Sequence, residues 1–178
     1  MRTAIVSDLH LGSGHGEDVA RDPAIRQVLL EQIDGADRLV LLGDALELRE
    51  LPQERVLATV GAFFEQLGEA MAGRPVVLVP GNHDHRLAEP LLEEAALNGE
   101  PLGLERLAEP RGEVATRLAA LLGKAELSIA YPGIWLRDDV YAIHGHYMDC
   151  HWTLPRLECV AAAGSMRLSG PLPERPTP

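Results

Sequence analysis

The chain has 178 residues, 46% of them apolar, and its 27 acidic and 16 basic side chains give a formal net charge of −11 at pH 7. This length predicts one domain of ordinary size, and the negative charge argues against nucleic acid or an anionic membrane as a partner. Two cysteines, no signal-peptide pattern and no apolar stretch of membrane-spanning length predict a cytoplasmic protein.

Short apolar runs that end in polar residues predict the strands of a sheet. In chain order they are TAIVSDLH (3–10), RLVLLGD (38–44), PVVLVPGNHD (75–84) and VYAIHGH (140–146). Their Val, Ile and Leu residues do not alternate with polar ones, which indicates strands that are buried on both faces. The runs are short and rich in β-branched residues, which favours strands over buried helices.

Two amphipathic segments between these runs predict helices. The first, 22–33, begins with Asp22 as an N-cap and Pro23 at the first helical position. The second, 52–73, carries an apolar stripe at helical spacing. The order strand, helix, strand, helix, strand predicts an α/β fold with right-handed crossovers.

The segment 86–123 is rich in Leu, Ala and Glu and is broken by Pro and Gly, so we expect two or three short helices there. We interpret this segment as an insertion or a cap over the site. In 125–145 we expect a strand, a turn at Pro132-Gly133, a short strand, a turn at Asp138-Asp139 and a final strand.

The C-terminal part of the chain is predicted to lie outside the core domain, 1–149. We expect a helical segment over 150–168 and a disordered Pro-rich tail over 169–178.

Polar clusters follow the predicted strands at the sheet edge where α/β proteins usually bind ligands. The chain's seven histidines all lie in or just beyond these clusters, namely His10, His15, His83, His85, His144, His146 and His151. Each cluster alone is also explained by ordinary turn or capping residues. Their joint occurrence indicates a metal site, and Asp, His and Asn donors suit Mn, Fe or Zn better than Ca.

The blocks SDLHLG, GDALE, GNHD and HGH, spread over 3–149, resemble the successive signatures of the calcineurin-like metallophosphoesterases. This superfamily of binuclear metal hydrolases implies a layered α/β/β/α sandwich of mixed sheets flanked by helices. It also implies two divalent ions, Mn, Fe or Zn, at the strand ends. The implied ligands are Asp8 and His10 for one ion, Asp44 for both, and Asn82 and His144 for the second.

The same resemblance implies hydrolysis of a small phosphorylated substrate, a phosphate mono- or diester or a pyrophosphate, by a hydroxide that bridges the two ions. His83 is implied as a general acid or stabilising donor over the leaving group, with Asp84 fixing its ring. Glu47 matches an acidic position that often follows the second block, and it is either a supporting residue or a solvated carboxylate. Arg86 is a candidate contact for a substrate phosphate or an ordinary surface arginine.

One family block, Gly-His-x-His, is absent, although its two histidines complete both metal shells in the family. Gly145-His146-Tyr147-Met148 lacks the second histidine, so His146, Asp149 and His151 are candidate replacements. We therefore expect a sandwich that is incomplete at the C-terminus, with an exposed sheet edge that favours homo-oligomers. The alternative function is a truncated or degenerate, non-catalytic metal-binding or scaffold module.

Overall fold

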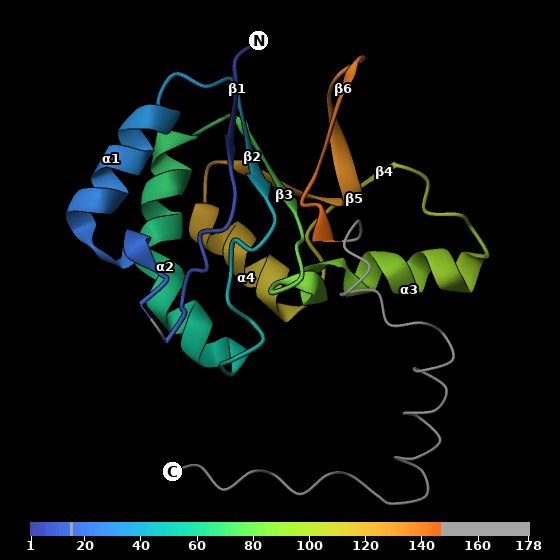
Figure 1. Cartoon of the computed structure of the whole chain (residues 1–178), viewed down its shortest axis with the longest axis horizontal. Coiled ribbons are helices and arrows are strands. Elements are labelled where there is room, and N and C mark those ends of the chain that lie inside the picture. The colour runs from blue at the N-terminus through green and yellow to red at the C-terminus, as the bar shows by residue number, and fades with distance from the viewer. Residues whose placement is uncertain (15, 147–178) are drawn as a thin grey trace, which may run out of the picture. The chain divides into compact units, whose positions relative to one another are not determined.

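A mixed, mostly parallel β-sheet organises the first of the chain's two units, Met1–His144 (Figure 1). The computed structural model describes residues 1–14 and 16–146, so the second unit, Gly145–Pro178, is described only at its first two residues. Several predictions lie outside the described residues, namely those for His15, Asp149, His151 and the segments 150–168 and 169–178.

The three parallel strands predicted in the first half of the chain are confirmed. They are β1 (Thr3–Val6), β2 (Arg38–Leu42) and β3 (Pro75–Val79), paired in that order. Leu42 lies opposite Val79, so the polar residues that follow these strands emerge at one edge of the sheet. An α/β fold with a mixed sheet and flanking helices is thus confirmed.

Both faces of β2 and β3 are buried, as their unbroken apolar runs predict, whereas Ile5 of the edge strand β1 is exposed. Leu39 and Leu41 of β2 belong to the larger hydrophobic core, which the helices cover. Val40 between them points to a smaller core on the opposite face, together with Val77 and Ile134. Successive strand residues point to opposite faces, so two apolar cores require an apolar residue at every position.

The helices of the larger core are α1 (Pro23–Ile33), α2 (Gln53–Ala70) and α4 (Glu113–Leu122), which lie together on one side of the strands (Figure 1). A short 3₁₀ helix, η1 (Val19–Arg21), precedes α1. The predicted N-cap of α1 is confirmed, because the Asp22 side chain accepts a hydrogen bond from the Ala24 amide at 2.8 Å. Among the described residues, no helix has the length and apolar character needed to cross a membrane.

The predicted turn at Pro132-Gly133 is wrong, because β5 (Glu126–Arg137) runs through it without a break. Its first half pairs with β3 and with the antiparallel strand β4 (Glu105–Ala108), and its second half pairs with β6 (Val140–Ile143). At Gly133 the pairing of β5 passes to β6. Glycine permits this close approach, since a Cβ there would lie 2.5 Å from the Ala142 carbonyl oxygen. The turn at Asp138-Asp139 is confirmed.

The segment 86–123 contains the expected short helices and one strand that the sequence analysis missed. The helices are η2 (His85–Ala88), α3 (Glu89–Asn98) and α4. β4 is integral to the sheet and α4 to the helical layer, so neither is a separate insertion. β4 has the sequence ERLA, and its Leu107 is exposed, so it lacks the apolar run of a buried strand. Figure 1 shows α3 extending away from the sheet, and its role as a cap stays a prediction.

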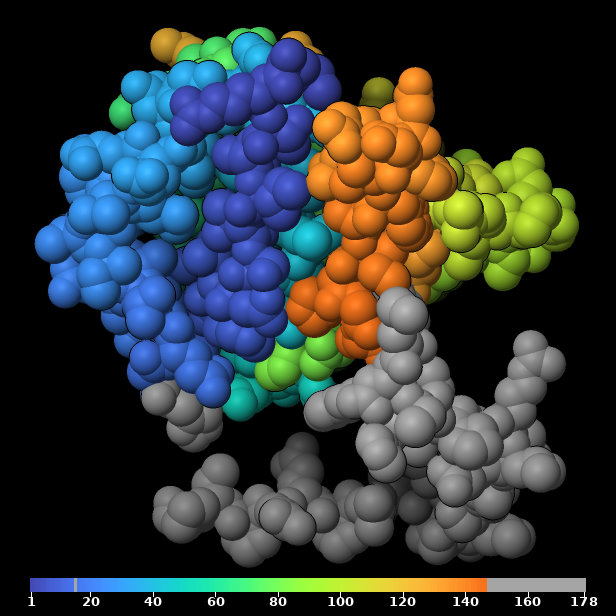
Figure 2. Space-filling model, turned by 45° about the horizontal axis from the view of Figure 1, so that its top comes forward, coloured from blue at the N-terminus to red at the C-terminus, as the bar shows by residue number. Residues whose placement is uncertain are grey.

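β1 lies at one end of the sheet and, among the described residues, pairs only with β2. Figure 2 shows this strand beside the hairpin of β5 and β6 on one face of the first unit. The two elements share a hollow of about 570 Å³ whose lining includes Ile5, Leu136 and Val140. An exposed strand edge therefore exists among the described residues, while homo-oligomer formation through it stays a prediction.

The contact between α2 and α4 generates a paired prediction on stability. A Cβ at Gly68 would lie 2.1 Å from the Leu122 carbonyl oxygen, whereas at Gly61 its nearest contact would be an ordinary 3.9 Å. We expect Gly68→Ala to lower the free energy of unfolding by about 1–3 kcal/mol through overpacking. Gly61→Ala should raise it by about 0.5–1 kcal/mol, since it removes only the helical cost of glycine.

Urea unfolding of the two variants and the parent chain measures both changes. Shifts of the same sign would contradict the close packing of Gly68 against α4.

Candidate metal centre

The loops that follow β1, β2 and β3 meet at one edge of the sheet and carry most of the predicted ligands. The Asp8 amide donates to the Gly43 carbonyl at 3.1 Å, and the His10 amide donates to the Asp44 carbonyl at 2.9 Å. The His83 amide donates to Asp44 Oδ1 at 2.8 Å. These bonds bring residues from distant parts of the sequence into one cluster.

Two groups of side chains within this cluster could each hold a metal ion. His10, Asp44 and His83 form one, and Asp8, Asp44 and His144 form the other, with ligand atoms within 4.8 Å of one another in each. Asp44 belongs to both groups, which is the arrangement that a bridging carboxylate requires. His144 Nε2 lies 3.4 Å from Asp44 Oδ2 and 3.5 Å from Asp8 Oδ1.

This grouping differs from the one that the resemblance implies. Asp8 lies with His144 rather than with His10, and His83, expected only beside the leaving group, lies within a metal-capable set. A third set of His10, Glu17 and Glu47 includes Glu17, which the sequence analysis did not single out. Glu17 lies in a loop outside the signature blocks, so no local signal marks it.

Two glycines let these side chains approach each other. A Cβ at Gly43 would lie 2.1 Å from His144 Cδ2, and a Cβ at Gly81 would lie 2.2 Å from Asp44 Oδ1. Any side chain at either position would displace a candidate ligand. The glycines of the GD and GNHD blocks are therefore needed for space as well as for turning the chain.

Three of the candidate ligands have left-handed backbone conformations. The φ angles are 55° at Asp8, 43° at His10 and 51° at Asp44, and no other described non-glycine residue has a positive φ. Such conformations cost on the order of 1–3 kcal/mol each and persist only where the surrounding structure enforces them. The strain is thus confined to the residues that point into the cluster.

Glu47 positions the His83 ring. Its buried carboxylate bonds to His83 Nδ1 through Oε2 and accepts the Arg49 and Glu50 amides through Oε1 at 3.0 and 3.3 Å. Burial acts to raise the pKa of Glu47, but these hydrogen bonds outweigh it and lower the pKa, so the carboxylate is ionised at neutral pH. The contact fixes the ring of His83, which shares a metal-capable group with His10 and Asp44.

The expectation that Asp84 fixes the ring of His83 is therefore wrong. Asp84 is buried and accepts the amides of Gly81 at 2.7 Å and Asp44 at 3.3 Å through Oδ1. Its Oδ2 accepts the amides of Ala45 and Leu46 at 2.8 and 3.2 Å. Burial and the nearby Asp44 charge raise the pKa of Asp84 to about 6 in spite of these bonds. Asp84 holds two loops together and does not touch the imidazole.

The described residues fit divalent metal ions. Nδ1 of His10 is buried and has no hydrogen-bond partner among them, and Glu47 Oε2 is 3.6 Å away. Burial acts to raise the pKa of Asp8, but hydrogen bonds from the Ser7 hydroxyl and from His144 lower it, so Asp8 carries a negative charge. Carboxylate and imidazole donors of this kind suit Mn, Fe or Zn.

Two further candidate metal ligands, Asn82 and His146, remain. Asn82 lies next to His83 and lines a neighbouring hollow, and its role as a ligand stays a prediction. His146 belongs to the second unit, so its role stays a prediction as well.

Comparison with known protein families agrees with this geometry. The model of the family described as calcineurin-like phosphoesterase matches residues 1–171. The matched range contains every candidate ligand.

The four amides around Asp84 generate a prediction on stability. In Asp84→Asn, one acceptor oxygen becomes an NH₂ group that faces two amide donors in a buried site. We expect a loss of about 2–4 kcal/mol in the free energy of unfolding, because buried donors lose their acceptor. Denaturant unfolding of the metal-free chain measures it.

Asp138→Asn, in the exposed turn before β6, is the matched control and should change the free energy by less than about 0.5 kcal/mol. Equal stability of the two variants would show that Asp84 does not hold the loops.

Proposed function

Because the chain belongs to the calcineurin-like phosphoesterase family, we propose that it hydrolyses a phosphate mono- or diester or a pyrophosphate with the help of two divalent ions. The observation that carries this proposal is the pair of metal-capable groups that share the buried carboxylate of Asp44. A carboxylate shared between two ion positions suits the two-metal mode of phosphoester hydrolysis.

The residues that would hold the ions are Asp8, His10, Asp44, Asn82 and His144. When bound, two such ions lower the pKa of a water molecule and offset charge on the phosphate oxygens. The chain itself supplies the geometry. The His83 amide occupies Asp44 Oδ1, and Asp44 Oδ2 lies towards His144, so the carboxylate is fixed in one orientation.

His83 is the proposed proton donor to the leaving group. Glu47 bonds to its Nδ1 and so orients the ring. In the proposed step, a proton on Nε2 passes to the oxygen that leaves phosphorus. Glu47 is a positioning residue in this scheme, since it acts through His83.

A non-catalytic metal-binding module is the second candidate function. The 178 residues contain no Gly-His-x-His block, and that absence favours this alternative. We also propose a cytoplasmic location, which the low cysteine content supports.

Metal content tests the binuclear site directly. After loading with Mn²⁺ and removal of free ion, elemental analysis should find about two ions per chain, and chelation should lower the melting temperature because bound ions stabilise the folded state. Asp44→Asn should lose both ions, since Asp44 belongs to both groups.

Asp138→Asn should retain both ions. One ion or none in the parent chain would count against the hydrolase and in favour of the binding module.

The pairing of His83 and Glu47 generates a prediction on activity. With bis(4-nitrophenyl) phosphate as substrate, His83→Ala should lower kcat by roughly 10²–10⁴-fold through loss of the proton donor. Glu47→Gln should lower kcat by a smaller factor, because the imidazole remains but loses the carboxylate that orients its ring.

Metal content measured on the same samples is the control. An unchanged kcat in Glu47→Gln, with metal content retained, would contradict the proposed role of Glu47.

A further inference from the structure

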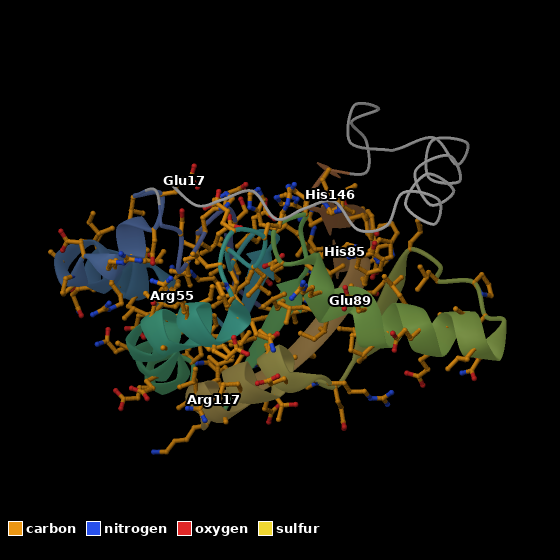
Figure 3. The ribbon with its side chains drawn as sticks, turned by 90° about the horizontal axis from the view of Figure 1, so that it is seen from below. Glu17, Arg55, His85, Glu89, Arg117 and His146 are labelled. Atoms are coloured by element: carbon orange, nitrogen blue, oxygen red, sulfur yellow. The ribbon has the colours of Figure 1, made fainter. Side chains whose placement is uncertain are left out.

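A hollow of about 290 Å³ opens beside the candidate metal centre. It is lined by Leu48, Arg49, Asn82, His83, His85, Arg86 and Glu89, which all follow β2 or β3 in the chain. His83 belongs both to this lining and to a metal-capable group, so the hollow adjoins the cluster on the side of the proposed proton donor. Figure 3 labels His85 and Glu89, which mark the hollow near the start of α3.

The hollow carries two arginines whose charges no described residue neutralises. The side chains of Arg49 and Arg86 are exposed and make neither an ion pair nor a hydrogen bond to the described part of the chain. By contrast, Arg106, Arg111 and Arg137 each pair with a carboxylate. Glu89 is the one carboxylate among the described lining residues, so two positive guanidinium charges face one negative charge there.

Buried interactions hold the walls of the hollow in place. The Arg49 amide donates to Glu47 Oε1 at 3.0 Å, and the Leu48 amide donates to the His83 carbonyl at 3.2 Å. His85 Nε2 lies 3.4 Å from the hydroxyl of the buried Tyr131, with the two rings edge to face. The backbone that carries the arginines is therefore tied to the same residues that orient His83.

We propose that this hollow binds an anionic part of the leaving group. The substrate is then a phosphoanhydride, or a phosphate ester whose leaving group carries a second anionic oxygen group. Guanidinium forks match the oxygens of phosphate and carboxylate groups, and a chain of net charge −11 needs local positive charge to hold such a substrate. This inference rests on the proposed function, since it assigns the substrate class of the same site.

Binding of non-hydrolysable probes tests the inference. Isothermal titration calorimetry on the Mn²⁺-loaded chain, freed of unbound ion, compares methylphosphonate with two probes of two anionic groups each, methylenediphosphonate and phosphonoacetate. We expect at least one two-anion probe to bind about tenfold or more tightly than methylphosphonate, in line with one or two charged hydrogen bonds. Their relative affinities tell whether the second anion is a phosphate or a carboxylate.

The double variant Arg49→Gln/Arg86→Gln should lose this preference and keep its affinity for methylphosphonate. The matched control is Arg55→Gln/Arg117→Gln, which removes the same charge from two exposed arginines on α2 and α4 that also lack a described partner. Figure 3 shows both away from His85 and Glu89. The control should keep the preference of the parent chain.

Two results would overturn the inference while the proposed function stands. One is Mn²⁺-dependent binding of all three probes with equal affinity. The other is that the control Arg55→Gln/Arg117→Gln loses the preference for two-anion probes as fully as Arg49→Gln/Arg86→Gln does. A chain that retains no Mn²⁺ and binds no probe would overturn the proposed function and the inference together.

Discussion

The buried carboxylate of Asp84 is the constraint on which the candidate site depends. Its two oxygens accept amides from Gly81 and from 44–46, so one side chain ties the loop after β2 to the loop after β3. Where these two loops meet, the Asp44 side chain lies close to Gly81 and the Asp44 backbone has a left-handed conformation. A buried acid is expensive unless its lone pairs are satisfied, and here four backbone donors satisfy them.

The site that results is unfavourable by itself. Asp8, His10 and Asp44 have strained backbones, and the carboxylates of Asp8 and Asp44 lie in one small group with His144. Bound cations would relieve the charge repulsion, and folding would be coupled to binding. Functional sites often lower the stability of the folded protein in this way, because the chemistry needs strained residues and like charges held close together.

The two buried carboxylates Asp84 and Glu47 have separate roles in the structure. Asp84 holds backbone and Glu47 holds an imidazole, and the directions of their pKa shifts follow this division. Burial raises the pKa of Asp84 to about 6, whereas hydrogen bonds lower that of Glu47. Glu47 also accepts the amide of Arg49, so the same residue connects the proposed proton donor to the basic hollow. The loop 43–50 thus contributes to both the proposed chemistry and the proposed substrate class, together with His83 and Arg86.

Local signals explain what the sequence by itself determined. Unbroken apolar runs predicted β1, β2 and β3, and the Asp22-Pro23 pair predicted the start of α1. The signature blocks predicted one site that contains Asp8, His10, Asp44 and His144, but not that Asp8 would lie with His144. Each depends on residues near one another in the chain or on a recurring motif. Only the tertiary structure decided that β5 continues through Pro132, that β4 joins the sheet and that Glu47 rather than Asp84 holds His83. The reason is physical, because each of these outcomes depends on the partner that a segment meets across tens of residues, and adjacency in sequence does not specify the direction of a side chain.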